Sequence, residues 1–234
     1  MAKRSVPDKR STAPAFIFDL DGTLVDSVYQ HVLAWQEALE AEGIQLAVWR
    51  IHRRIGMSGG LLINALVRET GGKVTRAQTE RLQKLHAKAY ARYAERIQLL
   101  PGSRELLKFL THVKVPWAIA TSSMGKTAEP TLRTLGVRSD AAVVTRDLVK
   151  YAKPDPDLFI AAAEKLGVDI TSCIVIGDSV WDMLAAVRAR ALPVGLLSGG
   201  YGQEELERAG AYRVYQDPAD LFHHLDEVGI RTRF

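Results

Sequence analysis

Residues 16–27 read FIFDLDGTLVDS, and the rest of the chain can be interpreted from this stretch. The apolar run AFIF leads directly into two carboxylates, Asp19 and Asp21, with Gly22 beside them. A short apolar run bounded by acids and a glycine is typical of an inner strand of a parallel sheet. Such sheets bind their ligands beyond the carboxyl ends of the strands, so we expect Asp19 to lie at a ligand site.

Two acids at this spacing bring several oxygens together, which is costly for like charges unless a hard cation or a shared proton relieves them. A DxD pair alone is common in surface loops. The full string DxDGTxxDS directly after an apolar strand is far more specific. It resembles the first signature of the haloacid dehalogenase superfamily, whose phosphatases use an aspartate as nucleophile. If the resemblance holds, the other motifs of that superfamily should follow at later strand ends.

The composition is that of a globular protein with a hydrophobic core, since 47% of the 234 residues are hydrophobic. The single cysteine, Cys173, lies in the apolar run SCIVIG, so no intramolecular disulfide can form. The first fourteen residues contain no signal peptide, and no uncharged apolar run approaches the length of a membrane span. We therefore expect a cytoplasmic protein that does not enter a membrane.

The net charge of +4 is concentrated in two segments. One is a basic tail, residues 1–14, and the other is residues 27–100, which hold eleven Lys and Arg against six Glu. The basic residues are not interleaved with aromatic side chains, as they are in a groove that binds single-stranded nucleic acid. We therefore expect a disordered tail and no nucleic-acid partner.

The pattern changes from strand to helix after the first motif. Ser27 and Gln30 form a capping-box pattern at the start of a helix that is predicted to run to Gly43. Two further helices are predicted, one near residues 60–70 and one at about 75–97 that opens with a Thr-x-x-Gln box. No buried strand is predicted among these helices.

From residue 103 onward, apolar strands alternate with helices, which predicts parallel crossovers and an α/β fold with a doubly wound, Rossmann-like sheet. Residues 15–26 and 99–234 would form this core domain, and residues 27–98 an inserted all-helical cap domain. The strands after the first are predicted at residues 116–121, 141–145, 173–177, 193–197 and 212–215. The helices are predicted at residues 103–112, 125–135, 156–166, 180–191, 203–209 and from 218.

Three further polar clusters fall at predicted strand ends: Thr121 with Ser122, then Lys153, then Asp178 with Asp182 one helical turn later. Taken singly, each has an ordinary alternative, namely a helix N-cap, a solvated lysine and a helix-capping acid. Their joint order resembles the four motifs of the superfamily in full, over nearly the whole chain. The most similar branch is that of phosphoglycolate phosphatase and beta-phosphoglucomutase.

The resemblance implies a Mg²⁺-dependent reaction through an aspartyl-phosphate. Asp19 would be the nucleophile, and its carboxylate would bind Mg²⁺ together with the Asp21 carbonyl and the Asp178 carboxylate. Asp182 would support this metal site by holding its ligands, without binding the ion itself. The groups implied to bind the phosphoryl oxygens are the Thr121 hydroxyl, the Lys153 ammonium and the amides of Gly22 and Ser122.

The Asp21 side chain has a separate implied role in proton transfer. It would protonate the leaving alcohol and then activate water, which calls for a higher pKa than that of metal-bound Asp19. Asp21 also argues against halide displacement and phosphonate cleavage, because the superfamily members that catalyse those reactions replace this second acid.

The cap is expected to exclude water and to select the substrate. Its positive charge over an acidic core suits an anionic ligand held between the two. The side chains that we expect nearest the cleft are His31, Arg53, Arg54 and Ser58. The alternatives are that His31 is buried in the cap core and that the arginines are solvated.

The predicted function is hydrolysis of a small phosphorylated metabolite by a phosphomonoesterase that is a monomer or a weak homodimer. The second hypothesis is a sugar-phosphate mutase, although Gly59 and the motif GDSVWD depart from the mutase pattern. The third is a catalytically silent phosphate-binding or phospho-accepting module, against which Lys153, Asp21 and the helical cap argue. The sequence leaves the substrate itself open.

Overall fold

In the computed structural model, which describes residues 14–230, six strands form one parallel sheet in the order β5-β4-β1-β6-β7-β8. The strands are β1 (Ala15–Phe18), β4 (Trp117–Ala120), β5 (Val143–Val144), β6 (Cys173–Gly177), β7 (Leu192–Leu196) and β8 (Arg213–Tyr215). This topology confirms the predicted doubly wound α/β fold. Apart from Pro14, the predicted basic tail lies outside the described residues.

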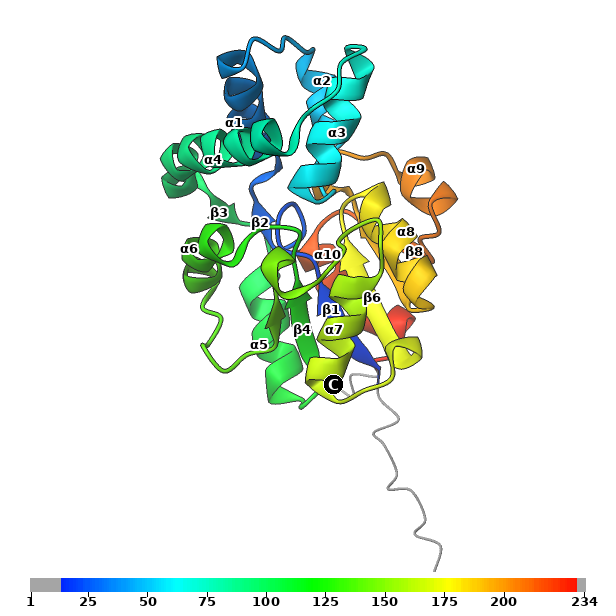
Figure 1. Ribbon diagram of the computed structural model, residues 1–234. Coiled ribbons are helices and arrows are strands. Elements are labelled where there is room, and N and C mark those ends of the chain that lie inside the picture. The colour runs from blue at the N-terminus through cyan, green and yellow to red at the C-terminus, as the bar shows by residue number, and fades with distance from the viewer. Residues whose placement is uncertain (1–13, 231–234) are drawn as a thin grey trace, which may run out of the picture.

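Helices cover both faces of this sheet (Figure 1). They are α5 (Ser103–His112), α6 (Gly125–Leu135), α7 (Asp157–Leu166), α8 (Val180–Ala189), α9 (Gln203–Arg208) and α10 (Pro218–His223). Helices α5 and α10 pack against one face, and α7 and α8 against the other. The observed bounds lie within two residues of the predicted ones, because a helix of this length shows its apolar periodicity in the local sequence.

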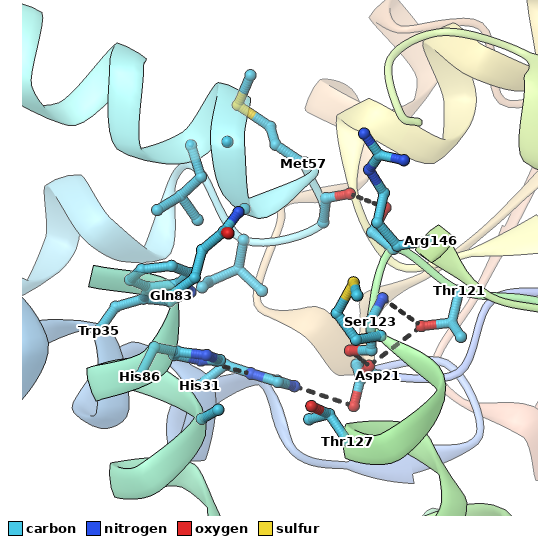
Figure 2. Close-up of a pocket in the computed structure, with 18 of the residues that line it drawn as sticks. Asp21, His31, Trp35, Met57, Gln83, His86, Thr121, Ser123, Thr127 and Arg146 are labelled. Atoms are coloured by element: carbon cyan, nitrogen blue, oxygen red, sulfur yellow. Dashed lines mark hydrogen bonds and ion pairs between the residues drawn. The ribbon is translucent and has the colours of Figure 1, made fainter. Parts of the chain in front are cut away.

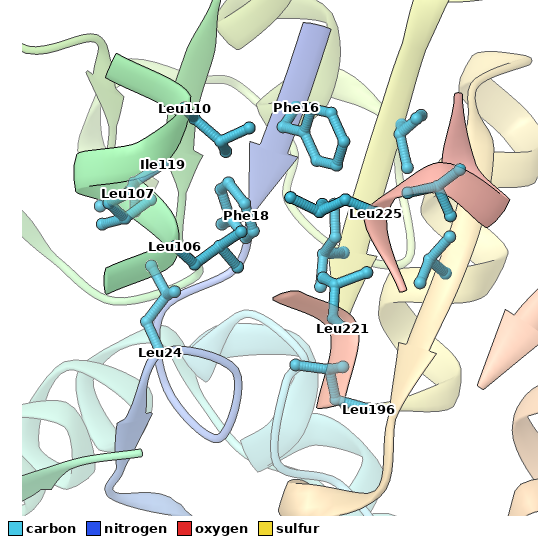
Figure 3. Packing of buried hydrophobic residues seen from close by; sticks show 14 of the residues in the cluster. Phe16, Phe18, Leu24, Leu106, Leu107, Leu110, Ile119, Leu196, Leu221 and Leu225 are labelled. Atoms are coloured by element: carbon cyan, nitrogen blue, oxygen red, sulfur yellow. The ribbon is translucent and has the colours of Figure 1, made fainter. Parts of the chain in front are cut away.

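Strand β1 is buried on both faces, as expected of an inner strand of a parallel sheet. Because side chains alternate along a strand, Phe16 and Phe18 join one hydrophobic cluster and Ile17 joins the other. Figure 3 shows the first cluster, in which the two phenylalanines pack with Leu106 and Leu221. Since packing on both sides fixes β1, the position of the acids that follow it is fixed as well.

The inserted segment forms a helical cap above the carboxyl edge of the sheet (Figure 1). Its helices are α1 (Val28–Ala41), α2 (Val48–His52), α3 (Gly59–Glu69) and α4 (Arg76–Tyr93). They enclose a hydrophobic cluster of their own, with Trp35, Leu62 and Leu82 among its buried members. The sequence did not predict α2, because five residues are too few for a helical period to appear.

Two short strands join the cap to the core. β2 (Val25–Asp26) pairs antiparallel with β3 (Gln98–Leu99), so the chain leaves and re-enters the core side by side. The sequence missed this pair, because two residues show no alternation. The helix predicted to reach residue 97 gives way to a 3₁₀ turn, Ala94–Arg96, before β3.

One of the two predicted capping boxes is confirmed and the other is wrong. At Thr75 the side chain and the backbone exchange hydrogen bonds with Gln78. At Ser27 the side chain does not cap α1, because its hydroxyl donates to the Asp21 carboxylate instead. Within residues 14–230, no helix has both the length and the apolar character that crossing a bilayer requires.

Candidate active site

The sheet order brings three of the predicted polar clusters together. β1 lies between β4 and β6, so Asp19, Thr121 and Asp178 follow three adjacent strands at one edge. The Asp19 amide donates to the Ile176 carbonyl at 2.8 Å, which continues the pairing of β1 with β6 to the first catalytic candidate. Thr121 and Asp178 are not helix caps, since Met124 and Ser179 hold the N-cap positions.

Lys153 reaches the same edge from a loop and is completely buried there. Its Nζ lies 2.5 Å from Asp19 Oδ1 and 2.7 Å from Asp182 Oδ1. Burial alone would lower the pKa of Lys153, but the charges of Asp182 and Asp19 outweigh burial and raise it above its ordinary value. Lys153 is therefore a buried cation that bridges two carboxylates, and the alternative of a solvated lysine is excluded.

Three buried carboxylates, those of Asp19, Asp178 and Asp182, have ligand atoms within 4.8 Å of one another. Burial and the charges of Asp182 and Asp21 raise the pKa of Asp19 to about 7, against the opposing charge of Lys153. Burial and the charges of Asp182 and Asp19 also raise the pKa of Asp178 well above its ordinary value. Three carboxylates beside one ammonium leave two negative charges unbalanced. A hard divalent cation with oxygen ligands fits this donor set, and Mg²⁺ is such a cation.

Asp178 is enclosed by small residues and one hydroxyl. Thr23 Oγ1 donates to Asp178 Oδ1 at 2.9 Å. A Cβ added to Gly22, whose φ is 84°, would lie 2.4 Å from Asp178 Oδ2, and one added to Gly199 would lie 1.8 Å from the same oxygen. Both positions therefore require glycine for close approach. The Gly22 amide donates to the Val25 carbonyl at 2.8 Å, so the implied role of this amide as a phosphate donor is not supported.

Asp182 is fixed at the start of α8. Its Oδ2 accepts hydrogen bonds from the amide and the hydroxyl of Ser179, while its Oδ1 faces Lys153. The capping box of α8 thus holds the carboxylate that positions the lysine ammonium. This contact explains how Asp182 can support the site without lying at a strand end.

The Asp21 carboxylate accepts hydrogen bonds from Ser27 Oγ at 2.6 Å and Ser123 Oγ at 2.8 Å, and His31 Nε2 lies 3.2 Å from its Oδ1. Thr121 Oγ1 is more distant, at 3.4 Å from Asp21 Oδ2. Burial would raise the pKa of Asp21, but the charge of His31 and these hydrogen bonds lower it well below its ordinary value. The pKa of Asp21 thus lies below that of Asp19 when no metal is bound, and the predicted order for metal-bound Asp19 stays a prediction.

His31 connects Asp21 to a stack of rings in the cap (Figure 2). Its Nδ1 lies 3.1 Å from His86 Nε2, and its ring stacks on Tyr90 at 4.0 Å between centroids. His86 in turn stacks on Trp35 at 4.1 Å. Burial and the charge of His31 lower the pKa of His86 well below its ordinary value, so this ring is neutral. No role was predicted for His86 or Tyr90, and their spacing of four residues on one helix was the available signal.

The other cap residues predicted near the cleft have different partners. Arg53 forms an ion pair with Glu205 and lies over the Tyr201 ring, and Arg54 forms an ion pair with Glu69 at 2.8 Å. Ser58 is buried, and its amide donates to the Lys153 carbonyl at 3.3 Å. Among the residues described, these three are absent from the lining of the cavity beside Asp19. His31 is the predicted cap residue that does line it.

That cavity lies between the cap and the core and has a volume of about 620 Å³. Asp19, Asp21, Thr121 and Ser122 line its core end. The Ser122 hydroxyl donates to the Gly56 carbonyl at 2.9 Å and so ties this loop to the cap. The arrangement places two carboxylates and several hydroxyl groups in the lining of a large cavity, with the buried Lys153 in contact with one of those carboxylates, as transfer of an anionic group requires.

The sequence profile of the haloacid dehalogenase-like hydrolases matches residues 13–190, and the chain belongs to that family. A phosphoglycolate phosphatase of Rhodospirillum rubrum is 31% identical over 214 residues, which cover 88% of each chain. A beta-phosphoglucomutase of Bacillus subtilis is 30% identical over 213 residues, which cover 88% of this chain and 91% of the relative. These matches confirm the predicted family and branch.

A solved structure of a hydrolase from Pseudomonas syringae superposes on this one with a TM-score of 0.91. Its sequence is 58% identical, and the match covers 93% of this chain and 100% of that one. The protein is therefore an enzyme of the phosphatase branch of its family, as the order of the four motifs predicts.

Proposed function

We propose that the protein hydrolyses a small phosphorylated metabolite with the aid of Mg²⁺, through an aspartyl-phosphate on Asp19. The observation that supports this most directly is the buried group of three carboxylates and Lys153, of which Asp19 lines the cavity. Phosphate esters resist attack because an anion must approach an anion, so a site for this reaction has to neutralise charge around its nucleophile.

Asp19, Asp178 and the backbone carbonyl of Asp21 would hold the Mg²⁺. The ion supplies positive charge that balances the carboxylates and the phosphoryl oxygens. Lys153, at 2.5 Å from Asp19 Oδ1, lowers the cost of keeping the nucleophile ionised and can also contact a phosphoryl oxygen. Asp182 holds the lysine in place from the other side. The Thr121 hydroxyl and the Ser122 amide are the further donors that we assign to the phosphoryl group.

We assign the proton for the leaving oxygen to Asp21. The same carboxylate then takes a proton from the water that attacks the aspartyl-phosphate. His31 Nε2, 3.2 Å from Asp21 Oδ1, is the neighbouring group that stabilises this carboxylate between the loss of its proton and the uptake of one from water. Ser27 and Ser123 hold Asp21 in one orientation through their hydrogen bonds. His31 thus acts on Asp21, in addition to lining the cavity.

A sugar-phosphate mutase is the second candidate, and the beta-phosphoglucomutase relative favours it. Both reactions would begin with the same aspartyl-phosphate, and they differ in whether water or a sugar hydroxyl accepts the phosphoryl group. Time-resolved product analysis with a sugar phosphate distinguishes them. Release of inorganic phosphate in step with substrate loss supports hydrolysis, whereas an isomer without phosphate release would rule it out.

The function is tested with a panel of phosphorylated metabolites and a readout of inorganic phosphate. We expect hydrolysis of at least one substrate, loss of activity with a chelator and recovery with added Mg²⁺. Thermal unfolding with and without Mg²⁺ gives a second readout, because an ion that binds the folded state raises the midpoint temperature. Activity that persists after the metal has been stripped would contradict the proposal.

A further inference from the structure

The cavity extends well beyond the carboxylates. Its volume of about 620 Å³ is in the range of pockets that enclose a whole drug-sized ligand. Trp35, Gln83 and His86 of the cap face Ser123 and Arg146 of the core across an open centre (Figure 2). This space is much larger than a phosphoryl group attached to a two-carbon acid would fill.

Gly59, at the start of α3, lines the cap side of the cavity and contributes no side chain to it. A Cβ added there would meet Gln83 Nε2 and Trp35 Cζ2 at 3.5 Å, which is ordinary contact. A Cβ added to the neighbouring Gly60 would meet no atom of the described residues within 4 Å. Since residue 59 has no side chain, the space in front of Trp35 and Gln83 is open. A longer side chain at this position would occupy that space.

The cavity lining also carries charged side chains of both signs. Among the described lining residues, Lys84 and Arg146 are cations and Glu80 and Asp147 are anions. Two cations against two anions exert no net attraction on a second anionic group of a substrate. The Arg146 and Asp147 side chains already bond to neighbouring groups of the core, so the Lys84 ammonium and the amide of Gln83 are the groups that suit hydroxyl groups of a ligand.

Another part of the lining is apolar. Ile55, Met57 and Leu62 from the cap and Met124 from the core line this part of the cavity. Apolar side chains of this kind pack against the carbon-bound hydrogens of a ligand without requiring hydrogen bonds. The two cap arginines that were expected near the cleft pair instead with Glu205 and Glu69 and are not available to a substrate carboxylate.

We infer that the substrate is a monophosphate of a neutral, polyhydroxylated body of hexose or hexitol size, and that Gly59 provides the room for that body. The inference rests on the proposed phosphatase function and adds its substrate class. The phosphoryl group lies at the carboxylates, the carbon chain packs against the apolar side chains of the lining, and the hydroxyl groups bind its polar side chains. A two-carbon acid leaves most of the cavity unfilled, and a bisphosphate brings a second anion to a wall without net charge.

The first experiment compares kcat/KM of the parent enzyme, with Mg²⁺, for glucitol 6-phosphate, glucose 6-phosphate, 2-phosphoglycolate, fructose 1,6-bisphosphate and acetyl phosphate. We expect the better hexitol or hexose monophosphate to exceed phosphoglycolate and the bisphosphate by about tenfold or more, the discrimination that pocket contacts supply. Equal or higher values for phosphoglycolate or the bisphosphate overturn the inference and leave the phosphatase function standing. Failure to hydrolyse any of the five, acetyl phosphate included, overturns both.

The second experiment changes the room in the cavity. In Gly59→Leu we expect the ratio of kcat/KM for the hexitol or hexose monophosphate to that for acetyl phosphate to fall by about tenfold or more. The matched control is Ala91→Leu, an exposed position of α4 outside the cavity lining, which should leave the ratio within about twofold of the parent. Circular dichroism verifies the fold of both variants. An unchanged ratio in a folded Gly59→Leu variant overturns the inference. If that variant does not fold, the substrate selectivity of the parent enzyme in the first experiment decides the inference.

Discussion

The core side and the cap side of the site are built from different interactions. On the core side Asp19, Lys153 and Asp182 are buried and contact one another directly. On the cap side Arg53 and Arg54 are partly exposed and pair with acids away from the cavity. Removing a member of the buried network leaves a charge without its partner, whereas removing an exposed charge lets water replace it. We therefore expect the chemistry to depend on the core side and substrate choice on the shape of the cap side.

The largest expected effect is at the nucleophile. Asp19→Asn keeps the shape of the side chain but removes its charge and one ligand of the metal, so turnover should fall by at least about 10³-fold. Steady-state phosphate release measures the loss. The control is Asp140→Asn, an exposed acid paired with Arg138, which should retain the parent rate. Activity of Asp19→Asn within tenfold of the parent would show that the assigned mechanism is wrong.

The next effect concerns proton transfer. Asp21→Asn should keep the metal, whose bond is to the backbone carbonyl, yet slow hydrolysis of an alkyl phosphate by roughly 10²- to 10⁴-fold. An aryl ester should lose much less in the first step, because p-nitrophenolate leaves without a proton. Rapid mixing should then show a burst of p-nitrophenol followed by slow turnover. Equal losses for both esters without a burst would instead make Asp21 a structural or metal-site residue.

Stability offers a test that does not depend on turnover. Lys153→Met leaves Asp19 and Asp182 buried without their shared cation, which should lower the free energy of unfolding by about 3–5 kcal/mol. Urea denaturation at neutral pH, in the presence of chelator, measures the change. Lys108→Met, on the exposed side of α5, is the control and should stay within about 0.5 kcal/mol of the parent. A loss of similar size in both variants would mean that the buried network does not stabilise the fold.

The smallest effect is expected at the cap. Arg53→Gln and Glu205→Gln break an ion pair whose side chains are 35% and 41% exposed, so the coupling energy should be only about 0.2–1 kcal/mol. A double-mutant cycle on urea unfolding measures it, with the two single variants and the double variant compared under one set of conditions. A coupling energy as large as the loss of stability expected for Lys153→Met would contradict the proposed difference between the core side and the cap side of the site.

The position of the acids could be predicted because it depends on local patterns and a general rule of sheet topology. Asp19, Thr121 and Asp178 each follow a short apolar run, and parallel strands place such residues at one edge. Lys153 was assigned from the order of the motifs, since a lone lysine in a loop carries no structural signal. Its complete burial between two carboxylates became evident only in the folded chain.

The cap contacts could not be predicted in the same way. His31 was expected at the substrate, and the structure shows that it also contacts Asp21 and His86. The partner of Arg53, Glu205, lies 152 residues away in the sequence, so no local pattern connects the two. The pKa values of Asp19 and Asp21 also depend on tertiary structure, because burial and neighbouring acids raise the first against the charge of Lys153, while the contact with His31 lowers the second.

The sequence by itself determined the alternation of strands and helices, the helical insertion and the order of the four motifs. These features could be predicted because apolar periodicity and the polar residues at strand ends are patterns of a few neighbouring residues. Tertiary structure alone decided which side chains meet. Thr23 with Asp178, Ser123 with Asp21 and Ser122 with Gly56 join segments 66 to 155 residues apart. Such contacts depend on how the cap lies on the core and how adjacent strands are ordered, and packing of the whole chain fixes both.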